Sequence, residues 1–391
     1  MLNWPMKRMK RACALATAGA LLVAATGCGG ATPAGGEQPP CRQSQASSVY
    51  RQAIAADRPL LRRLKQGLRA PGLSLAVARG GKIVWSVSCG YADLKSRRPV
   101  TAQTRFRIGS VSKTLTAAAL AHYAEVRRLD LDAPVDRYVD FPSHGGTITL
   151  RRLAGHLAGI RHYESQAEAV NRRHFTSVAD TLVLFKDDPL VAAPGTRFSY
   201  SSYGYDVVGA ALERVAGRDF ATLMHEAVLG PAAMRETTLA TAPRAARATF
   251  YEVQESGGVR VAPLIDLSDR LPAGGFLSTA DDLARFGLAL TDGTLVGRQA
   301  AAVMFRSQRT TTGEATGYGL GFEVHPSPFG LFVGHTGAVA GGTAALLIHV
   351  RSGTVLALTT NLGYATAISP PPPKSGTPDP PELLLPFIRG R

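Results

Sequence analysis

Hydrophobic residues recur at two different spacings near the start of the chain, and each spacing predicts a different element. Between Gln43 and Arg69 they follow a helical period with basic residues in between, which predicts an amphipathic helix. We expect this helix to pack on its own domain rather than on a membrane surface. The segments 73–77 and 82–87 alternate in polarity on either side of Gly80-Gly81, which predicts a β-hairpin.

The pattern changes again further along the chain. From Ser110 to Arg128 the residues are apolar on nearly every side, which predicts a buried helix. Residues 147–300 are mostly helical in pattern, with long loops. Strand-like segments follow at 319–324, 331–334, 343–350 and 354–359. This order predicts an α/β fold of the α+β type, in which both ends of the chain build one antiparallel sheet flanked by helices.

We therefore predict one catalytic domain over residues 44–368. Its sheet part comprises about 44–108 and 305–368, and an all-helical inserted part comprises about 109–304. Residues 369–391 are rich in proline and are expected to form a tail of loop or extended chain, because proline fits neither a helix interior nor a strand ladder.

The N-terminus has the pattern of a secretion signal over residues 1–27. Four basic residues precede the apolar run 12–26, which is shorter than the ~20 residues of a membrane-spanning helix. The run ends in Ala-Thr-Gly-Cys, which resembles a bacterial lipobox with Cys28 as the lipidated residue. Residues 28–43 would then be the linker of a lipoprotein held on the outer side of the cytoplasmic membrane. Ordinary signal cleavage is the alternative.

The charge balance bears on the partner. The chain has 391 residues, with 44 Lys+Arg against 29 Asp+Glu and a net charge of +15. Removing the four basic residues of the signal leaves 40 against 29, or +11. The remaining bases are scattered rather than gathered in one stripe, so we predict no nucleic-acid partner. An anionic membrane or cell-wall surface suits this charge better.

The candidate chemistry starts at Lys113. It is one of eight lysines and lies inside the apolar helical run, where a lone ammonium is costly to bury. Ser110 lies three residues earlier, so the two side chains share a helical face at the helix N-terminus. A serine beside a desolvated lysine is a nucleophile with its own base. A Ser-x-x-Lys pattern alone also fits a helix cap and a surface lysine, so further motifs are needed.

Two further segments supply them, Tyr200-Ser201-Ser202 in a loop that enters a helix and His335-Thr336-Gly337 near the C-terminal strands. With Ser110-Val111-Ser112-Lys113, they resemble the Ser-x-x-Lys, Tyr-x-Asn and Lys-Thr-Gly motifs of serine β-lactamase-like and penicillin-binding hydrolases, a group related to class C β-lactamases. The likeness spans about residues 70–362. It is strongest to the subgroup of serine β-lactamase-like proteins, whose eukaryotic members are mitochondrial.

The resemblance implies a β-lactamase/transpeptidase-like fold and a serine hydrolase that forms an acyl-enzyme at Ser110. Lys113 and Tyr200 would share and relay the proton, and the backbone N–H groups of Ser110 and Ala338 would form the oxyanion hole. His162, Tyr163, Glu164, Thr336 and Gly337 are expected to line the substrate site on family resemblance alone.

Ser202 and His335 depart from the family pattern and are assigned supporting roles. Ser202 replaces an asparagine and offers fewer donors. His335 replaces a lysine, so we expect it to bind a substrate carboxylate only when protonated, and to lose it as the pH rises through about 6.5. Both changes argue against a dedicated β-lactamase.

Further predictions concern cysteines, metals and assembly. Cys41 and Cys89 could form a disulfide in an oxidising compartment, although the sequence cannot show that they meet. No His-Glu-x-x-His or similar pair occurs, so we predict no metal and no cofactor. A homo-oligomer is possible.

The leading interpretation is an envelope-anchored hydrolase of amide or ester bonds in a small peptide, ester or β-lactam-like substrate, peptidase-like and with weak or no β-lactamase activity. The alternatives are a cell-wall D,D-carboxypeptidase, an esterase, and a non-catalytic, filament-forming scaffold.

Overall fold

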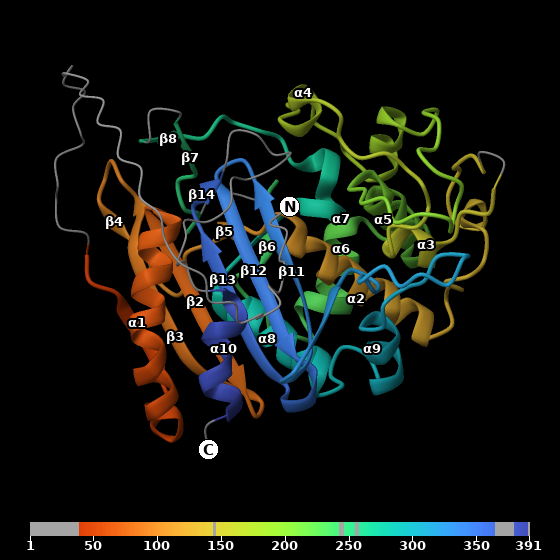
Figure 1. Cartoon of the computed structure of the whole chain (residues 1–391). Helices are drawn as coiled ribbons and strands as arrows, with labels where there is room; N and C mark the ends of the chain where they lie inside the picture. Colours follow the sequence, from red (N-terminus) through yellow and green to blue (C-terminus); the bar gives the residue numbers. More distant parts are fainter. Residues whose placement is uncertain (1–38, 144–145, 242–245, 255–257, 364–378, 390–391) are drawn as a thin grey trace, which may run out of the picture.

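An eight-stranded antiparallel sheet forms the centre of the computed structural model (Figure 1), which describes residues 39–143, 146–241, 246–254, 258–363 and 379–389. The strand order is β1-β3-β2-β13-β12-β11-β10, and β4 pairs with β3. The strands from the N-terminal part are β1 (Arg42–Ala46), β2 (Gly72–Arg79), β3 (Lys82–Asp93) and β4 (Arg98–Pro99). Those from the C-terminal part are β10 (Glu323–Ser327), β11 (Gly330–Val339), β12 (Gly342–His349) and β13 (Thr354–Thr360).

Both ends of the chain thus build one sheet, as the pattern predicted. The two halves join where β13 pairs with β2, with Leu356 opposite Val77. The predicted hairpin at Gly80-Gly81 is present, since β2 and β3 pair on either side of it. Both glycines adopt the positive φ that such a turn requires. The predicted strand 319–324 is wrong in its bounds, since β10 begins only at Glu323.

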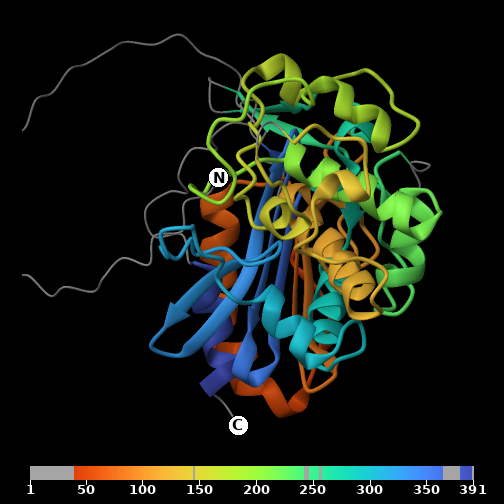
Figure 2. The ribbon, with the colours of Figure 1, turned by 90° about the vertical axis from the view of Figure 1, so that its right-hand side faces the viewer.

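Helices cover both faces of the sheet (Figure 2). One face carries α1 (Arg51–Leu68) and α10 (Pro380–Arg389). The other face carries α8 (Ala280–Thr291) and the large helical region. The remaining helices are α2 (Ser112–Glu125), α3 (Leu150–Ala154), α4 (Gln166–Ala169), α5 (Tyr203–Ala216), α6 (Phe220–Met224), α7 (Leu271–Gly274) and α9 (Arg298–Met304). The buried helix predicted after Ser110 is α2, whose residues from Ser112 to Ala121 are all buried.

Three further predictions about the fold need correction. The first concerns the helix expected from Gln43. Residues Arg42–Ala46 are instead the strand β1, and the helix starts at Arg51. The five residues of β1 are exposed, yet they pair with β3 directly after a disulfide between Cys41 and Cys89. This tertiary pairing outweighs their local preference.

The second correction concerns the inserted part, which is not all helical. It contains strands in two small three-stranded sheets, of orders β14-β7-β8 and β5-β9-β6. Their strands are β5 (Phe106–Arg107), β6 (Thr238–Leu239), β7 (Tyr251–Val253), β8 (Val259–Val261), β9 (Phe276–Ser278) and β14 (Leu362–Gly363). These strands have only two or three residues each, too few to show an alternating pattern.

The third correction concerns the C-terminal tail, because α10 belongs to the fold. Its side chains Leu383, Leu384 and Phe387 are fully buried against the sheet and α1. Pro380 stands at the start of the helix, where its missing N–H costs nothing. The proline content of this segment therefore led to the prediction of a tail where an amphipathic helix forms.

The segment 364–378 and the signal region, including Cys28, lie outside the described residues. Within the described ranges, no helix is both long and apolar enough to span a bilayer.

Candidate active site

Ser110 lies in the 3₁₀ turn Gly109–Val111 (η2), which leads directly into α2. Gly109 has a φ of +49°, and a Cβ there would lie 2.8 Å from the backbone nitrogen of Ala338 in β11. Glycine is therefore needed both for the turn and for the close approach of β11. A Cβ at Gly337 would likewise lie 3.0 Å from the Ser110 nitrogen. The two backbone segments expected to form the oxyanion hole are thus in contact.

Lys113 is fully buried at the start of α2, with three oxygen atoms around its amine. Its Nζ lies 3.1 Å from Ser110 Oγ, 3.1 Å from Ser202 Oγ and 2.9 Å from the carbonyl oxygen of Ala273. Burial lowers the pKa of Lys113 to about 7. A neutral amine has two hydrogens and one lone pair. With the hydrogens donated to Ser202 and Ala273, the lone pair faces the Ser110 hydroxyl.

Tyr200 is the second group on the nucleophile. Its hydroxyl donates to Ser110 Oγ at 2.8 Å, and the Lys113 Nζ lies 4.9 Å from the centre of its ring. Burial raises the pKa of Tyr200 above its ordinary value, so the phenol keeps its proton at neutral pH. At neutral pH the Lys113 amine is thus the group on Ser110 that is able to accept a proton, and the Tyr200 phenol is the group that is able to donate one.

Ser202 and His162 are linked to each other beside Lys113. The Ser202 hydroxyl accepts from Lys113, and the Ser202 backbone N–H donates to His162 Nδ1 at 3.2 Å. The His162 ring stands edge-on to Tyr200, with centroids 5.5 Å apart. Burial and the nearby Lys113 lower the pKa of His162 to about 3, so this imidazole is neutral.

His335 is buried, and both of its ring nitrogens are engaged. Nδ1 donates to the Thr336 carbonyl oxygen, and Nε2 accepts from the Tyr318 hydroxyl at 2.8 Å. Burial lowers the pKa of His335 to about 4. This corrects the expectation that His335 titrates near 6.5 and binds a substrate carboxylate by its charge. The motif histidine is a neutral, structural link in this site.

The residues expected to line the substrate site differ in placement. Thr336 is half-buried on β11, next to Gly337. The Tyr163 hydroxyl is buried, and its ring packs on Tyr203 and Arg270 rather than on Ser110. Glu164 is exposed, and its backbone N–H donates to Glu168.

Sequence reasoning missed several residues that support the site. His156 is buried beneath Tyr200, with ring centroids 4.3 Å apart, and its Nδ1 accepts from the Ser201 backbone N–H. Ala273 supplies a carbonyl to Lys113 and directly precedes Gly274-Gly275. Tyr318 is bound to His335. None of these three residues lies in the three motifs, so their roles become visible only through their contacts in the fold.

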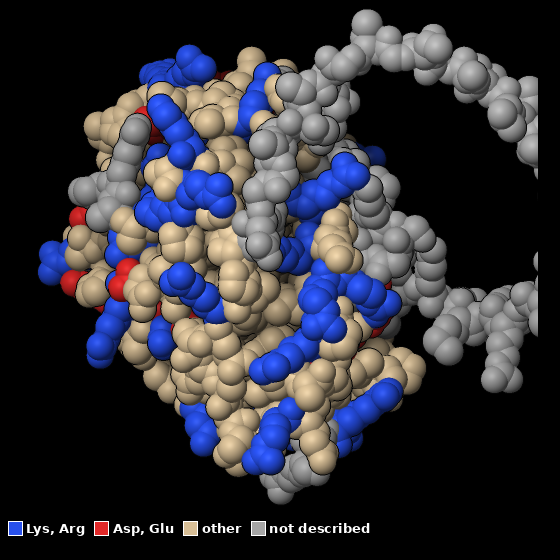
Figure 3. Space-filling model, turned by 90° about the vertical axis from the view of Figure 1, so that its left-hand side faces the viewer, with Lys and Arg blue, Asp and Glu red and all other residues tan. Residues whose placement is uncertain are grey.

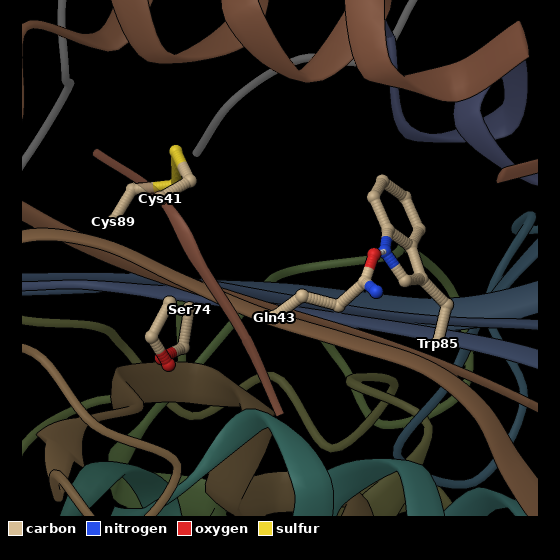
Figure 4. Close-up of a disulfide and its surroundings, with 6 residues drawn as sticks. Cys41, Gln43, Ser74, Trp85 and Cys89 are labelled. Atoms are coloured by element: carbon tan, nitrogen blue, oxygen red, sulfur yellow. Dashed lines mark hydrogen bonds between the residues drawn. A yellow bond between two sulfur atoms is a disulfide. The ribbon is translucent and has the colours of Figure 1, made fainter. Parts of the chain in front are cut away.

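The disulfide between Cys41 and Cys89 lies on the opposite side of the sheet from α8, near α1 (Figure 4). It attaches the chain just before β1 to the long strand β3. Near it, Trp85 Nε1 donates to the Gln43 side chain. The bond fixes the point where the N-terminal segment joins the fold.

Comparison with known proteins agrees with this geometry. The family model described as beta-lactamase matches residues 58–370. The chain belongs to the β-lactamase family. This confirms the resemblance and the fold class predicted from the three motifs.

Several relatives within this family can be compared directly. The human mitochondrial serine beta-lactamase-like protein LACTB is 32% identical over 332 residues, which cover 66% of this chain and 59% of that protein. The chain therefore matches only about three fifths of this relative. Penicillin-binding protein 4* of Bacillus subtilis is 26% identical and is covered over 65% of its length, with 71% of this chain.

A solved structure shares the fold. The octameric penicillin-binding protein homologue from Pyrococcus abyssi superposes with a TM-score of 0.69 at 24% identity, over 79% of this chain and 73% of that one.

Proposed function

We propose that the protein is a serine hydrolase that cleaves amide or ester bonds through an acyl-enzyme at Ser110. One observation carries the proposal, the contact of the Ser110 hydroxyl with both the buried Lys113 amine and the Tyr200 phenol. This is the arrangement of a nucleophile with an adjacent base and a separate proton donor.

The reaction follows from the two contacts. Lys113 takes the proton of Ser110 as Oγ attacks the substrate carbonyl, and the C–O bond forms while the carbonyl becomes an oxyanion. In this mechanism the backbone N–H groups of Ser110 and Ala338 stabilise that charge. Tyr200 then protonates the leaving amine or alcohol as the C–N or C–O bond breaks, and it is reprotonated from Lys113. Water, activated by the same pair, releases the acid.

Two features favour peptidase- or esterase-like chemistry over β-lactam hydrolysis. Ser202 offers a single hydroxyl where the family pattern has an amide, and His335 is neutral where the pattern has a cation. A catalytically idle scaffold is disfavoured, because a lysine buried without function costs free energy. A D,D-carboxypeptidase remains the alternative that release of D-Ala from a muropeptide would favour.

The test is covalent labelling with a fluorophosphonate probe, read by intact mass and peptide mapping. We expect one adduct on Ser110, and none in Ser110→Ala. A matched control is Ser112→Ala, two residues away and fully buried. Label that persists in Ser110→Ala, or that maps elsewhere, would overturn the proposal.

We further propose that the protein is secreted and anchored by a lipid on Cys28. A disulfide such as Cys41–Cys89 is typical of proteins outside the cytoplasm. Basic side chains are spread over the face that carries α1, and few acidic side chains are visible there (Figure 3). The only acid of α1, Asp57, is buried, so the exposed charges of this helix are all basic. A face with exposed basic side chains suits an anionic membrane.

The anchor is tested in a bacterial host grown with radiolabelled palmitate. The chain should take up label and fractionate with the membrane, and Cys28→Ser should abolish the label and release the protein. Cys13→Ser, within the signal, is the matched control. Equal labelling of both variants would contradict the proposal. A homo-oligomer stays a prediction, checked by sizing chromatography.

A further inference from the structure

Glu323 is a carboxylate beside the active site that the proposed mechanism does not use. It begins β10, opposite Gly334 of β11. Its Oε1 lies 3.5 Å from the Thr336 hydroxyl and 3.9 Å from His335 Nδ1, and its Oε2 lies 3.2 Å from His325 Nε2. The Glu323 side chain keeps 24% of its surface exposed, so a substrate can reach it.

The charge on this carboxylate is retained at neutral pH. Burial on its own would favour the neutral acid, but the contacts with His325, His335 and Thr336 outweigh it and lower the pKa of Glu323. Within the described part of the chain, the basic side chains within ion-pair distance of Glu323 are the imidazoles of His325 and His335, and no lysine or arginine is among them. His335 is neutral above about pH 4. The surroundings of Thr336 therefore include an anion where the family motif would supply a cation.

The distance to the reacting atoms is short. Thr336 stands two residues before Ala338, whose backbone contacts the turn of Ser110. Two residues of a strand span roughly 7 Å. A substrate group bound at Thr336 and Glu323 is thus only a few bonds from the carbonyl that Ser110 attacks.

We propose that Glu323 is a specificity-determining residue that binds an ammonium group of the substrate beside Thr336. The enzyme then prefers amides or esters that carry a free amine over those that carry a carboxylate at the same place. This inference rests on the proposed hydrolase function. The net charge of +15 would by itself attract anions, so a preference for a cation must come from the site.

The test uses three matched esters that carry an ammonium, a neutral or a carboxylate group, prepared with the group on the acyl side and again on the leaving side. On one of the two sides, we expect the kcat/KM of wild type to be about tenfold or more higher for the ammonium ester than for the carboxylate ester. This ratio combines the attraction of a partly exposed charge pair between the ammonium and Glu323 with the repulsion between Glu323 and the carboxylate ester. Glu323→Gln should remove this preference and leave the neutral ester within about twofold.

Glu314→Gln is the matched control, because Glu314 is exposed on the loop before β10. It should keep the preference of wild type. If Glu323→Gln slows all three esters equally, Glu323 serves only to hold His325, and the inference is overturned. A charge preference unchanged in Glu323→Gln overturns it as well.

Failure of the underlying function looks different from failure of this inference. Without hydrolase activity, the neutral ester is not cleaved and Ser110 takes up no fluorophosphonate. If Ser110 is labelled and the neutral ester is cleaved, but position 323 does not change the charge preference, only the inference fails.

Discussion

Lys113 in the active site and Asp57 in the α1 layer are both fully buried ionisable residues, and they differ in their surroundings. Burial shifts the pKa of each toward the neutral form, to about 7 for Lys113 and about 8 for Asp57. Lys113 has oxygen atoms of three residues around its amine. In the described part of the chain, neither carboxylate oxygen of Asp57 has a hydrogen-bond partner.

The comparison shows that a shifted pKa does not by itself mark a functional group. The other buried residues of α1 are Ala53, Ile54, Leu61 and Leu64, whose side chains neither receive nor deliver a proton. Lys113 contacts a serine hydroxyl that is itself partly exposed. The partners decide whether a buried charge performs chemistry or only lowers stability.

The largest effect is expected when Lys113, the active-site member of this comparison, is replaced. Lys113→Met keeps a chain of similar length but removes the base, so the rate of Ser110 acylation should fall by about 10²–10⁴. Stopped-time fluorophosphonate labelling measures this, with circular dichroism to check the fold. Lys82→Met, at the exposed start of β3, should label at the rate of wild type. Normal labelling of Lys113→Met would exclude it as the base.

A smaller effect is expected in the α1 layer, on stability instead of rate. An acid whose folded pKa is raised from 3.8 to about 8 loses stability as the pH rises through this window. Asp57→Asn removes the charge, so it should raise the Tm by about 5 °C or more at pH 8, and by less near pH 4. Thermal unfolding at the two pH values measures the difference.

The exposed Asp136→Asn is the control for this measurement and should leave the Tm nearly unchanged. Acylation of Ser110 should also be unaffected in Asp57→Asn. If Asp57→Asn is less stable than wild type at pH 8, Asp57 has a favourable partner, and the contrast with Lys113 is contradicted.

The smallest effect concerns the partners of Lys113. Ser202 accepts a hydrogen bond that favours the charged amine, so Ser202→Ala should lower the pKa of Lys113 further. We expect the midpoint of the acylation profile to move to lower pH, by about one unit or less. Ser201→Ala, which loses a bond to the Arg161 carbonyl instead, should not move it. A shift to higher pH would mean that Ser202 acts in the opposite sense.

The sequence predicted those parts of the molecule whose signal is local. The β2–β3 hairpin follows from alternation and two glycines, and α2 follows from its apolar run. Ser110, Lys113 and Tyr200 were predicted from motifs, and the structure brings their side chains together.

What the sequence did not predict depends on contacts between distant segments. The pairing of β1 with β3 and the packing of α10 on α1 both join residues far apart in the chain. The neutral state of His335 depends on its burial beside Tyr318. Glu323 has no motif of its own and becomes relevant only because β10 places it next to Thr336.

The pH dependence of Ser110 acylation tests the central claim most directly, that Lys113 is the base because burial lowers the pKa of its amine to about 7. The labelling rate of wild type should rise with pH as the amine loses its proton and level off above a midpoint at about 7. A rate that shows no such rise between about pH 5 and 9, or a midpoint near the ordinary lysine value of roughly 10.4, would contradict the account.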